Sequence, residues 1–336
     1  MRTRAHAFTL VELLVVIAIM GILMSIIVPA VAGAQKSARE AQERKQLSDV
    51  NMSWKSWASS NKGAYPIPGL VRRQMMDLDG DGNGDEFVAG SGREDARWNA
   101  HNAMLSLCIM ENLLVPDQLV SPNEYSDTVY AHDAYKYGTL GQIDTDGATI
   151  KWDPGFSNDL TGDEVGYSHN SYAIMPLAGE RRRDQWDRTG SSSFAVLGTR
   201  GPMNGCATRL NPEAVDCDSN ASVETSNTAY LMGKPGAWRG IIVFADGHSD
   251  LADGFYPDGS TWTSVDEVTG VTMELPDNVF RADAEAAGDW ISSDTALLGS
   301  DILLTHTHSD GDASNPLWSP SSEINPYDVD FQPLHD

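Results

Sequence analysis

The sequence predicts an α+β protein in which one long N-terminal helix carries a head built on an antiparallel β-sheet. Two observations predict this arrangement. Near the N-terminus of the 336-residue chain, an apolar run continues into an amphipathic pattern of helical period. Short apolar runs bounded by polar turns, which are typical of antiparallel strands, come later in the chain. The helix is therefore expected over residues 8–61 and the head over residues 62–336.

The apolar run covers about residues 8–34, and no charged residue occurs between 13 and 34. At about 1.5 Å per residue, a helix of this length crosses a hydrocarbon core of about 30 Å. Glu12 lies at its leading edge, where a carboxylate entering lipid costs roughly 2.5–3.5 kcal/mol and requires a partner. A cut between Ala7 and Phe8 would create an amino group four residues before Glu12. In a neighbouring copy of the helix that is shifted along its axis, this amino group can lie next to the Glu12 carboxylate of the first copy.

The segment FTLVELLVVIAIMGIL, behind a short basic leader, resembles the class III signal of type IV pilins and type II secretion pseudopilins. The resemblance covers about residues 1–60 and implies a pilin-like fold. It implies that a prepilin peptidase removes residues 1–7 by cutting between Ala7 and Phe8, and that the new N-terminus is methylated. It also implies that Glu12 guides assembly with copies of the chain or with other pilin-like subunits, on an inner-membrane assembly platform.

An ordinary, removable secretory signal is the alternative interpretation, because small residues at 30–34 offer cleavage sites. However, the apolar run exceeds the usual length of about 7–15 residues, and Glu12 lies where such a signal has apolar residues. The pilin-type interpretation predicts a single-pass protein of the bacterial inner membrane. Its head is expected in the periplasm or in a filament on the cell surface.

The second half of the predicted helix has an apolar stripe that is expected to pack on the head. Leu47, Val50 and Trp54 recur at helical spacing between charged residues. Gly63 and Pro66 supply the expected stop signals.

The net charge of −25 is distributed unevenly along the chain. Residues 1–62 contain eight Lys and Arg against four Asp and Glu, whereas the remainder contains 15 against 44. An acidic head repels the phosphates of nucleic acids, so no nucleic-acid partner is expected. Such a head is suited to binding cations.

The acidic stretch at residues 77–87, DLDGDGNGDEF, follows the spacing of a calcium-binding loop, in which alternate oxygen ligands surround one cation. The candidate ligands are Asp77, Asp79, Asp81, Asn83 and Asp85. The last position of the loop is Val88, where a bidentate Glu is usual. A solvated acidic turn is therefore the alternative to calcium.

Two of the three cysteines, Cys206 and Cys217, are close in sequence and are expected to form a disulfide in an oxidising compartment. Closing such a loop contributes roughly 3 kcal/mol in the chain-entropy model. Two reduced thiols are the alternative. Cys108 lies in an apolar stretch and is expected to be a small buried side chain.

A second helix is expected over residues 96–114, with His101 on its polar face. The stretch from there to about residue 170 is rich in Asp, Gly, Tyr and Ser, which predicts large loop insertions in the head.

Strand signals are clearest at residues 171–177, 193–199 and 240–254. In the last of these, Asp246 and Gly247 favour a hairpin with a two-residue turn. The segment RGIIVFADGHSDLAD is also similar to the end of the sheet in large pilin-like proteins.

The segment ILLTHTHSDGD contains His306 and His308, which would share one face of a strand and could bind a transition metal. It resembles the His-X-His start of some metal hydrolases. No second His-rich segment supplies the further ligands and the general base that catalysis needs. Solvated loop histidines, and no enzymatic activity, are therefore expected.

Together these features predict a structural subunit of a type IV pilus-like or type II secretion pseudopilus filament. One alternative is a minor pilin at the filament tip that binds a surface or a secreted substrate. Another is a secreted metal-dependent hydrolase behind an ordinary signal. A shaft subunit would be abundant, a tip subunit rare, and a hydrolase would turn over substrate with bound metal.

Overall fold

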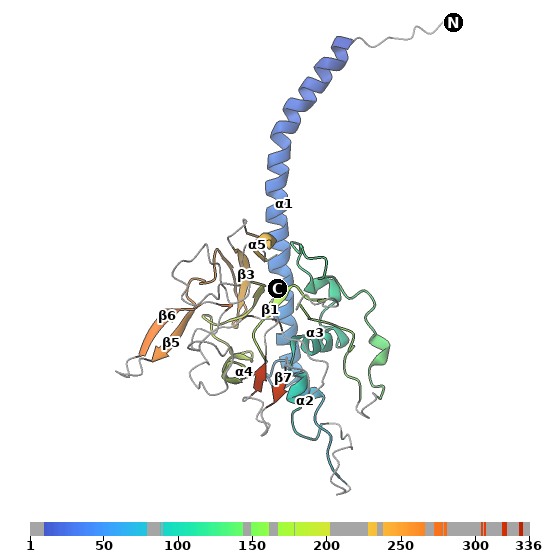
Figure 1. Cartoon of the computed structure of the whole chain (residues 1–336), viewed down its shortest axis with the longest axis vertical. Coiled ribbons are helices and arrows are strands. Elements are labelled where there is room, and N and C mark those ends of the chain that lie inside the picture. The colour runs from blue at the N-terminus through green and yellow to red at the C-terminus, as the bar shows by residue number, and fades with distance from the viewer. Residues whose placement is uncertain are drawn as a thin grey trace, which may run out of the picture.

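The computed structural model shows one long helix rising from a head of short helices, loops and β-strands (Figure 1). The residues that the structure describes are 10–78, 88, 90–143, 149–160, 167–177, 179–201, 228–233, 238–265, 272–277, 279–280, 304, 306, 318–320 and 329–331.

Helix α1 (Leu10–Ser60) contains 51 residues, which confirms the predicted long N-terminal helix. At about 1.5 Å per residue it is about 76 Å long. Its first half projects from the head and its second half runs through it (Figure 1). Pro29, which cannot donate a backbone hydrogen bond, lies inside α1. The projecting half of the helix is curved (Figure 1). The helix ends at Ser60, and Gly63 follows it with a φ of 91° and donates its N–H to Ala58 O at 2.8 Å.

The largest sheet in the described part of the chain has four antiparallel strands. They are β1 (Tyr172–Ile174), β2 (Ala195–Thr199), β3 (Gly240–Phe244) and β4 (Ser249–Ala252), and they neighbour one another in that order. All residues of β1, β2 and β3 are buried. The strand regions predicted from the apolar runs are thus confirmed, and together with α1 they form an α+β pilin-like fold.

Strands β3 and β4 form the predicted hairpin, but the prediction of a two-residue turn is wrong. Residues 245–247 form a three-residue loop between Phe244 and His248, and Phe244 N donates to His248 O at 3.0 Å. Gly247 takes a φ of 96°, as is usual for three-residue hairpin loops. Lys55 of α1 lies against this turn, since a Cβ on Gly247 would be 2.2 Å from Lys55 Nζ.

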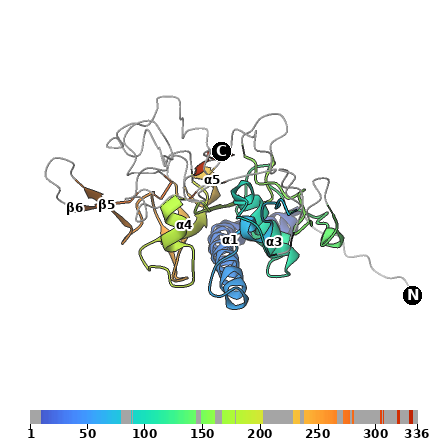
Figure 2. The ribbon, with the colours of Figure 1, turned by 90° about the horizontal axis from the view of Figure 1, so that it is seen from below.

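The core forms around the buried stripe of α1, which includes Leu47, Val50 and Trp54. Figure 2 shows α1 between α3 (His101–Met110) on one side and α4 (Gly179–Gln185) on the other. The ring centroid of Trp54 lies 4.7 Å from that of Trp186, which fixes α1 against the segment after α4. The stripe is therefore the inner support of the head.

The predicted helix over 96–114 is divided into the 3-10 helix η1 (Ala96–Trp98) and α3, which ends before Asn112 at a φ of 57°. Every residue of α3 is buried, so placing His101 on a polar face was wrong. Its Nε2 lies 3.0 Å from Met175 O, and burial lowers the pKa of His101 to about 4. Cys108 is buried as predicted.

The remaining elements are short. The helices are α2 (Pro68–Val71), η2 (Pro116–Leu119), η3 (Tyr137–Thr139) and α5 (Thr228–Leu231), and the strands are β5 (Thr261–Val265), β6 (Thr272–Pro276), β7 (Trp318–Pro320) and β8 (Val329–Phe331). The β5–β6 hairpin extends away from the body of the head (Figure 1).

Candidate assembly site

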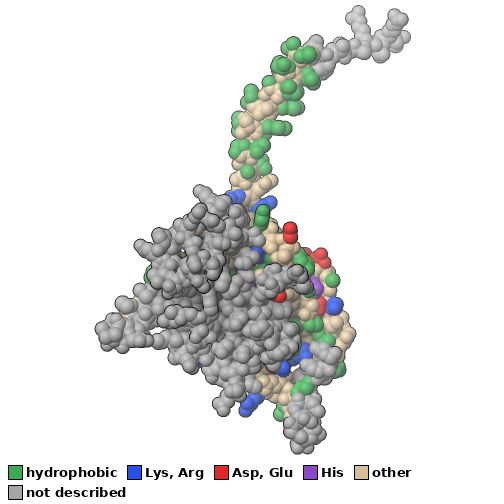
Figure 3. Space-filling model, in the orientation of Figure 1, with side chains coloured by type: hydrophobic (Ala, Val, Ile, Leu, Met, Phe, Trp, Pro, Cys, Tyr) green, Lys and Arg blue, Asp and Glu red, His purple; other side chains and the backbone are tan. Residues whose placement is uncertain are grey.

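The N-terminal half of α1 exposes apolar side chains along its whole length in the isolated subunit, as the face seen in Figure 3 illustrates. Leu10 is 78% exposed and Ile26 is 66% exposed. Among the described helices, α1 is the one long and apolar enough to cross a membrane, and none of its most apolar stretch is buried inside the protein. Because such a surface is unfavourable in water, lipid or other helices must cover it.

Glu12 lies in the first turn of α1 and is exposed. The partial positive charge at a helix N-terminus favours an acid at this position. Ala7 and Phe8, the predicted cleavage site, lie outside the described residues. The proposed pairing of Glu12 with a processed N-terminus therefore stays a prediction.

A second carboxylate on α1, Glu43, is completely buried where the helix enters the head. Its Oε1 accepts from Thr199 Oγ1 at 2.6 Å. Its Oε2 accepts from Ser121 Oγ at 2.8 Å and from Asn123 Nδ2 at 2.6 Å. Glu43 thereby joins α1 to the end of β2 and to the loop after η2.

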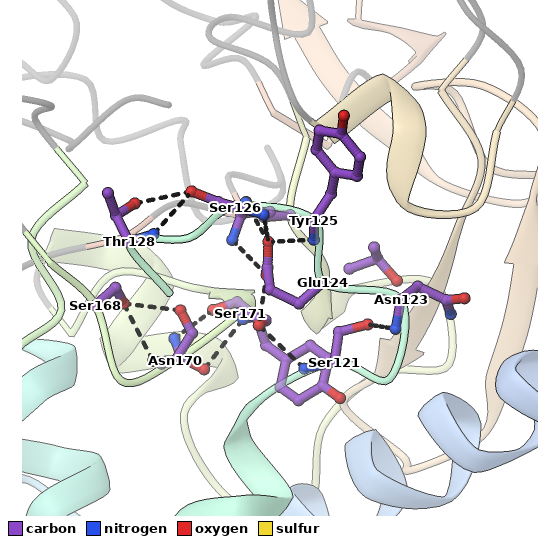
Figure 4. Close-up of polar contacts among 12 residues, drawn as sticks. Ser121, Asn123, Glu124, Tyr125, Ser126, Thr128, Ser168, Asn170 and Ser171 are labelled. Carbon is purple, nitrogen blue, oxygen red and sulfur yellow. Dashed lines mark hydrogen bonds and ion pairs between the residues drawn. The ribbon is translucent and has the colours of Figure 1, made fainter. Parts of the chain in front are cut away.

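Beside it, Glu124 and Arg200 form a buried ion pair with two contacts. Arg200 Nη1 lies 2.8 Å from Glu124 Oε2, and Arg200 Nη2 lies 2.9 Å from Glu124 Oε1. Only 1% of the Arg200 side chain and 6% of the Glu124 side chain are exposed. Ser171 Oγ also donates to Glu124 Oε2 at 2.7 Å. Figure 4 shows the segment that carries Glu124 folded against Ser171 and its neighbours.

Sequence reasoning missed both buried carboxylates. A signal for Glu43 was present, because it precedes Leu47 by four residues and Val50 by seven, which puts it on the buried stripe. Glu124 and Arg200 are 76 residues apart, and no local sequence pattern predicts that they pair.

Burial raises the pKa of Glu43, although hydrogen bonds from Thr199, Asn123 and Ser121 lower it in part. The folded state therefore binds this proton more tightly than the unfolded state does. The ordinary pKa of a glutamate is 4.5, and below this pH the proton contributes its full stabilisation of the folded state. That stabilisation is lost as the pH rises through the higher pKa that Glu43 has in the folded state.

Glu43→Gln is expected to remove this loss, so its stability relative to the parent should increase as the pH rises above 4.5. Urea unfolding of both proteins between about pH 4 and pH 8 measures the difference. Glu111→Gln, on the exposed residue after α3, is the control and should follow the parent. A constant difference between Glu43→Gln and the parent across this range would contradict the assignment.

His306 is buried, so the expectation of a solvated loop histidine is wrong for this residue. Its Nδ1 lies 3.1 Å from Asn158 Oδ1, which also accepts from Asn170 Nδ2 at 3.1 Å. This arrangement ties His306 to the loops before β1. His308 lies outside the described residues.

The predicted calcium ligands and disulfide fall largely outside the described part of the chain. Asp77 is described and exposed, whereas Asp79, Asp81, Asn83 and Asp85 lie outside the described residues. Cys206 and Cys217 also lie outside them, so their disulfide stays a prediction. Among the residues that are described, no three His, Cys, Asp or Glu side chains gather into a group that could hold a metal ion.

Comparison with protein families agrees with the geometry of α1. Residues 2–28 match the family model of the prokaryotic N-terminal methylation motif, which is the signal of type IV pilins and pseudopilins. The chain thus carries the processing signal of a pilin-like, membrane-anchored subunit. No curated protein and no solved structure gives a significant match to it.

Proposed function

We propose that this chain is a structural subunit of a filament of the type IV pilus or type II secretion pseudopilus kind. The observation that carries the proposal is the division of α1 into two halves. The half that overlaps the methylation motif is apolar and exposed, whereas the following half is built into the core of the head. A helix divided in this way can leave the lipid and pack against equivalent helices while its head stays folded.

In this proposal, prepilin peptidase cuts between Ala7 and Phe8, and the new amino group is methylated. The resulting cation meets Glu12 of a neighbouring subunit, which sets the axial stagger between the helices. The acidic heads then form the outer surface of the filament. The proposal does not depend on any catalytic group of the head.

Intact-mass measurement of the membrane-extracted protein tests the processing step. The expected mass is that of residues 8–336 with one added methyl group. Ala7→Trp, which puts a bulky residue before the cut, should leave the precursor mass. A mass corresponding to cleavage within residues 30–34 would instead support the ordinary secretory signal.

Composition of purified filaments distinguishes the shaft from the tip. A shaft subunit should be the most abundant pilin-like chain in sheared filaments, whereas a tip subunit should be present at a small fraction of the major chain. A small fraction would show that the chain is a tip subunit and not a shaft subunit.

We further propose that the acidic loop starting at Asp77 binds calcium and stabilises the head. A ligand that binds only the folded state adds RT ln(1 + [L]/Kd), which is about 2.7 kcal/mol at one hundred times Kd. Melting of the full chain in detergent should therefore occur at higher temperature with calcium than with chelator. Asp79→Ala should abolish that difference, while Asp258→Ala, at an exposed position elsewhere in the head, should preserve it. Equal melting with calcium and with chelator would refute the proposal.

A further inference from the structure

A pocket of about 270 Å³ lies where α1 enters the head. Its lining includes Lys36, Arg39 and Glu40 of α1, and Leu231 and Met232 at the C-terminal end of α5. The lining also includes Asn123, whose side-chain amide donates to Glu43. The pocket therefore adjoins the buried polar network but is open to its surroundings.

The pocket stands at the height of the lipid headgroups when the apolar half of α1 spans a membrane. The apolar run ends at Ala34. At about 1.5 Å per residue, Lys36 and Arg39 lie about 3 Å and about 7.5 Å beyond it along the axis. The headgroup layer on each side of a bilayer is about 5–7 Å thick. Both cations therefore fall within or at the edge of the layer that contains the lipid phosphates.

Two cationic side chains of the pocket, Lys36 and Arg39, can bind an anion. Lys36 and Arg39 are exposed and are separated by three residues, so they lie on the same face of α1. Neither takes part in an ion pair with any residue that the structure describes. The nearby acid Glu40 is already neutralised, because Arg239 Nη1 lies 2.7 Å from its Oε1.

The pocket also has apolar lining residues, which suit the part of a lipid next to its phosphate. Leu231 is 4% exposed and Met232 is 3% exposed, so their side chains are held by the head. Ala32, one turn before Lys36, also lines the pocket and belongs to the apolar run that ends at Ala34. Two cations next to apolar side chains match an anionic headgroup attached to acyl chains.

We propose that this pocket binds the phosphate headgroup of an anionic phospholipid, with Lys36 and Arg39 as its two cationic contacts. The occupant is a membrane lipid and not a soluble phosphate, because the pocket opens beside the membrane-spanning half of α1. The proposal rests on the membrane anchoring of the subunit and does not require it to polymerise.

The expected consequence concerns the position of the head before assembly. The chain after residue 62 carries 15 basic against 44 acidic residues, so an anionic membrane repels most of the head. A lipid bound in the pocket would hold the base of the head against the bilayer despite this repulsion.

Native mass spectrometry of the mature full chain, released from mixed vesicles of phosphatidylglycerol and phosphatidylcholine, tests the proposal. The parent should retain phosphatidylglycerol in preference to phosphatidylcholine. A cation near an anionic surface changes affinity by about fivefold, so Lys36→Gln/Arg39→Gln should lower this preference by roughly 30-fold. The exchanged pair Lys36→Arg/Arg39→Lys keeps both charges and should retain it.

The matched control is Lys45→Gln/Arg188→Gln, which also removes one Lys and one Arg from exposed positions but outside the pocket. It should keep the preference of the parent. Hydrogen exchange in nanodiscs locates the lipid, because amides of residues 228–233 should exchange more slowly with phosphatidylglycerol than with phosphatidylcholine. Equal retention of both lipids by the parent, or an equal loss in the control, would overturn the proposal. Retention of free glycerol phosphate in place of lipid would overturn it as well.

Discussion

Glu12→Ala is expected to reduce the amount of subunit in filaments by about tenfold or more, without changing membrane insertion, processing or folding of the head. Glu12 lies in the exposed apolar half of α1, about thirty residues before Glu43, the first side chain of the helix that is buried in the head, so the head does not depend on it. In the filament that we propose, it pairs with the processed N-terminus of a neighbour. Two unit charges at 4 Å attract by about 4 kcal/mol at an effective dielectric of 20, and desolvation offsets much of this. If about 1.4 kcal/mol of this attraction remains, the equilibrium constant for assembly changes tenfold.

Quantifying subunit in sheared filaments against the membrane pool measures this effect. Glu12→Gln separates charge from size and should assemble as poorly as Glu12→Ala. Glu12→Asp should recover part of the assembly, limited by its shorter reach. Asp49→Ala removes an acid from the head half of α1, where Asp49 pairs with the exposed Lys45, and should assemble like the parent. Normal assembly of Glu12→Ala would remove the main physical support for a polymerising subunit.

Arg200→Met is expected to lower the free energy of unfolding by about 3–5 kcal/mol, because it leaves the buried Glu124 without its cation. For a head of this size, such a loss corresponds to a fall of roughly 10 °C in the melting temperature. Circular dichroism of the full chain in detergent measures it. Arg239→Met is the matched control, because the Arg239 side chain is 26% exposed and pairs with Glu40; it should lose no more than about 1 kcal/mol.

The double variant Arg200→Met/Glu124→Gln tests the cause of that loss. It removes both charges and keeps an amide oxygen for the backbone N–H groups of Tyr125 and Ser126, which donate to Glu124 Oε1 at 2.9 Å. It should therefore be more stable than Arg200→Met alone. If the double variant were the less stable of the two, the unpaired carboxylate would not be the origin of the effect.

Local patterns in the sequence predicted the parts of the fold that local interactions determine. The apolar run and the stripe through Leu47 and Trp54 predicted α1, and the alternation of apolar runs and turns predicted β3 and β4. The length of the hairpin loop was predicted wrongly, because Lys55 of α1 donates to Asp246 O at 2.7 Å and so engages the turn from another element. Such a contact cannot be predicted from the sequence of the hairpin alone.

The buried polar groups depended on tertiary packing, and this is why they were missed or misplaced. His101 follows the sequence rule for a polar helix face, but α3 is surrounded on every side, so no polar face exists. Arg200 is a charged residue directly after an apolar strand, a position that usually marks the return to solvent. Here Glu124, brought in by the loop after η2, neutralises it in the interior.

The continuity of α1 has a mechanical consequence. One continuous helix, which curves in its projecting half, connects the apolar half to Trp54 in the centre of the head. Tension along a filament axis would therefore reach the head through the helix itself. It would pull the buried stripe of α1 parallel to its contacts with the head, so that many of these contacts resist the force at the same time. Glu43, with its three hydrogen bonds to two other segments, stands where that load first enters the head. Rupture would have to begin at this junction.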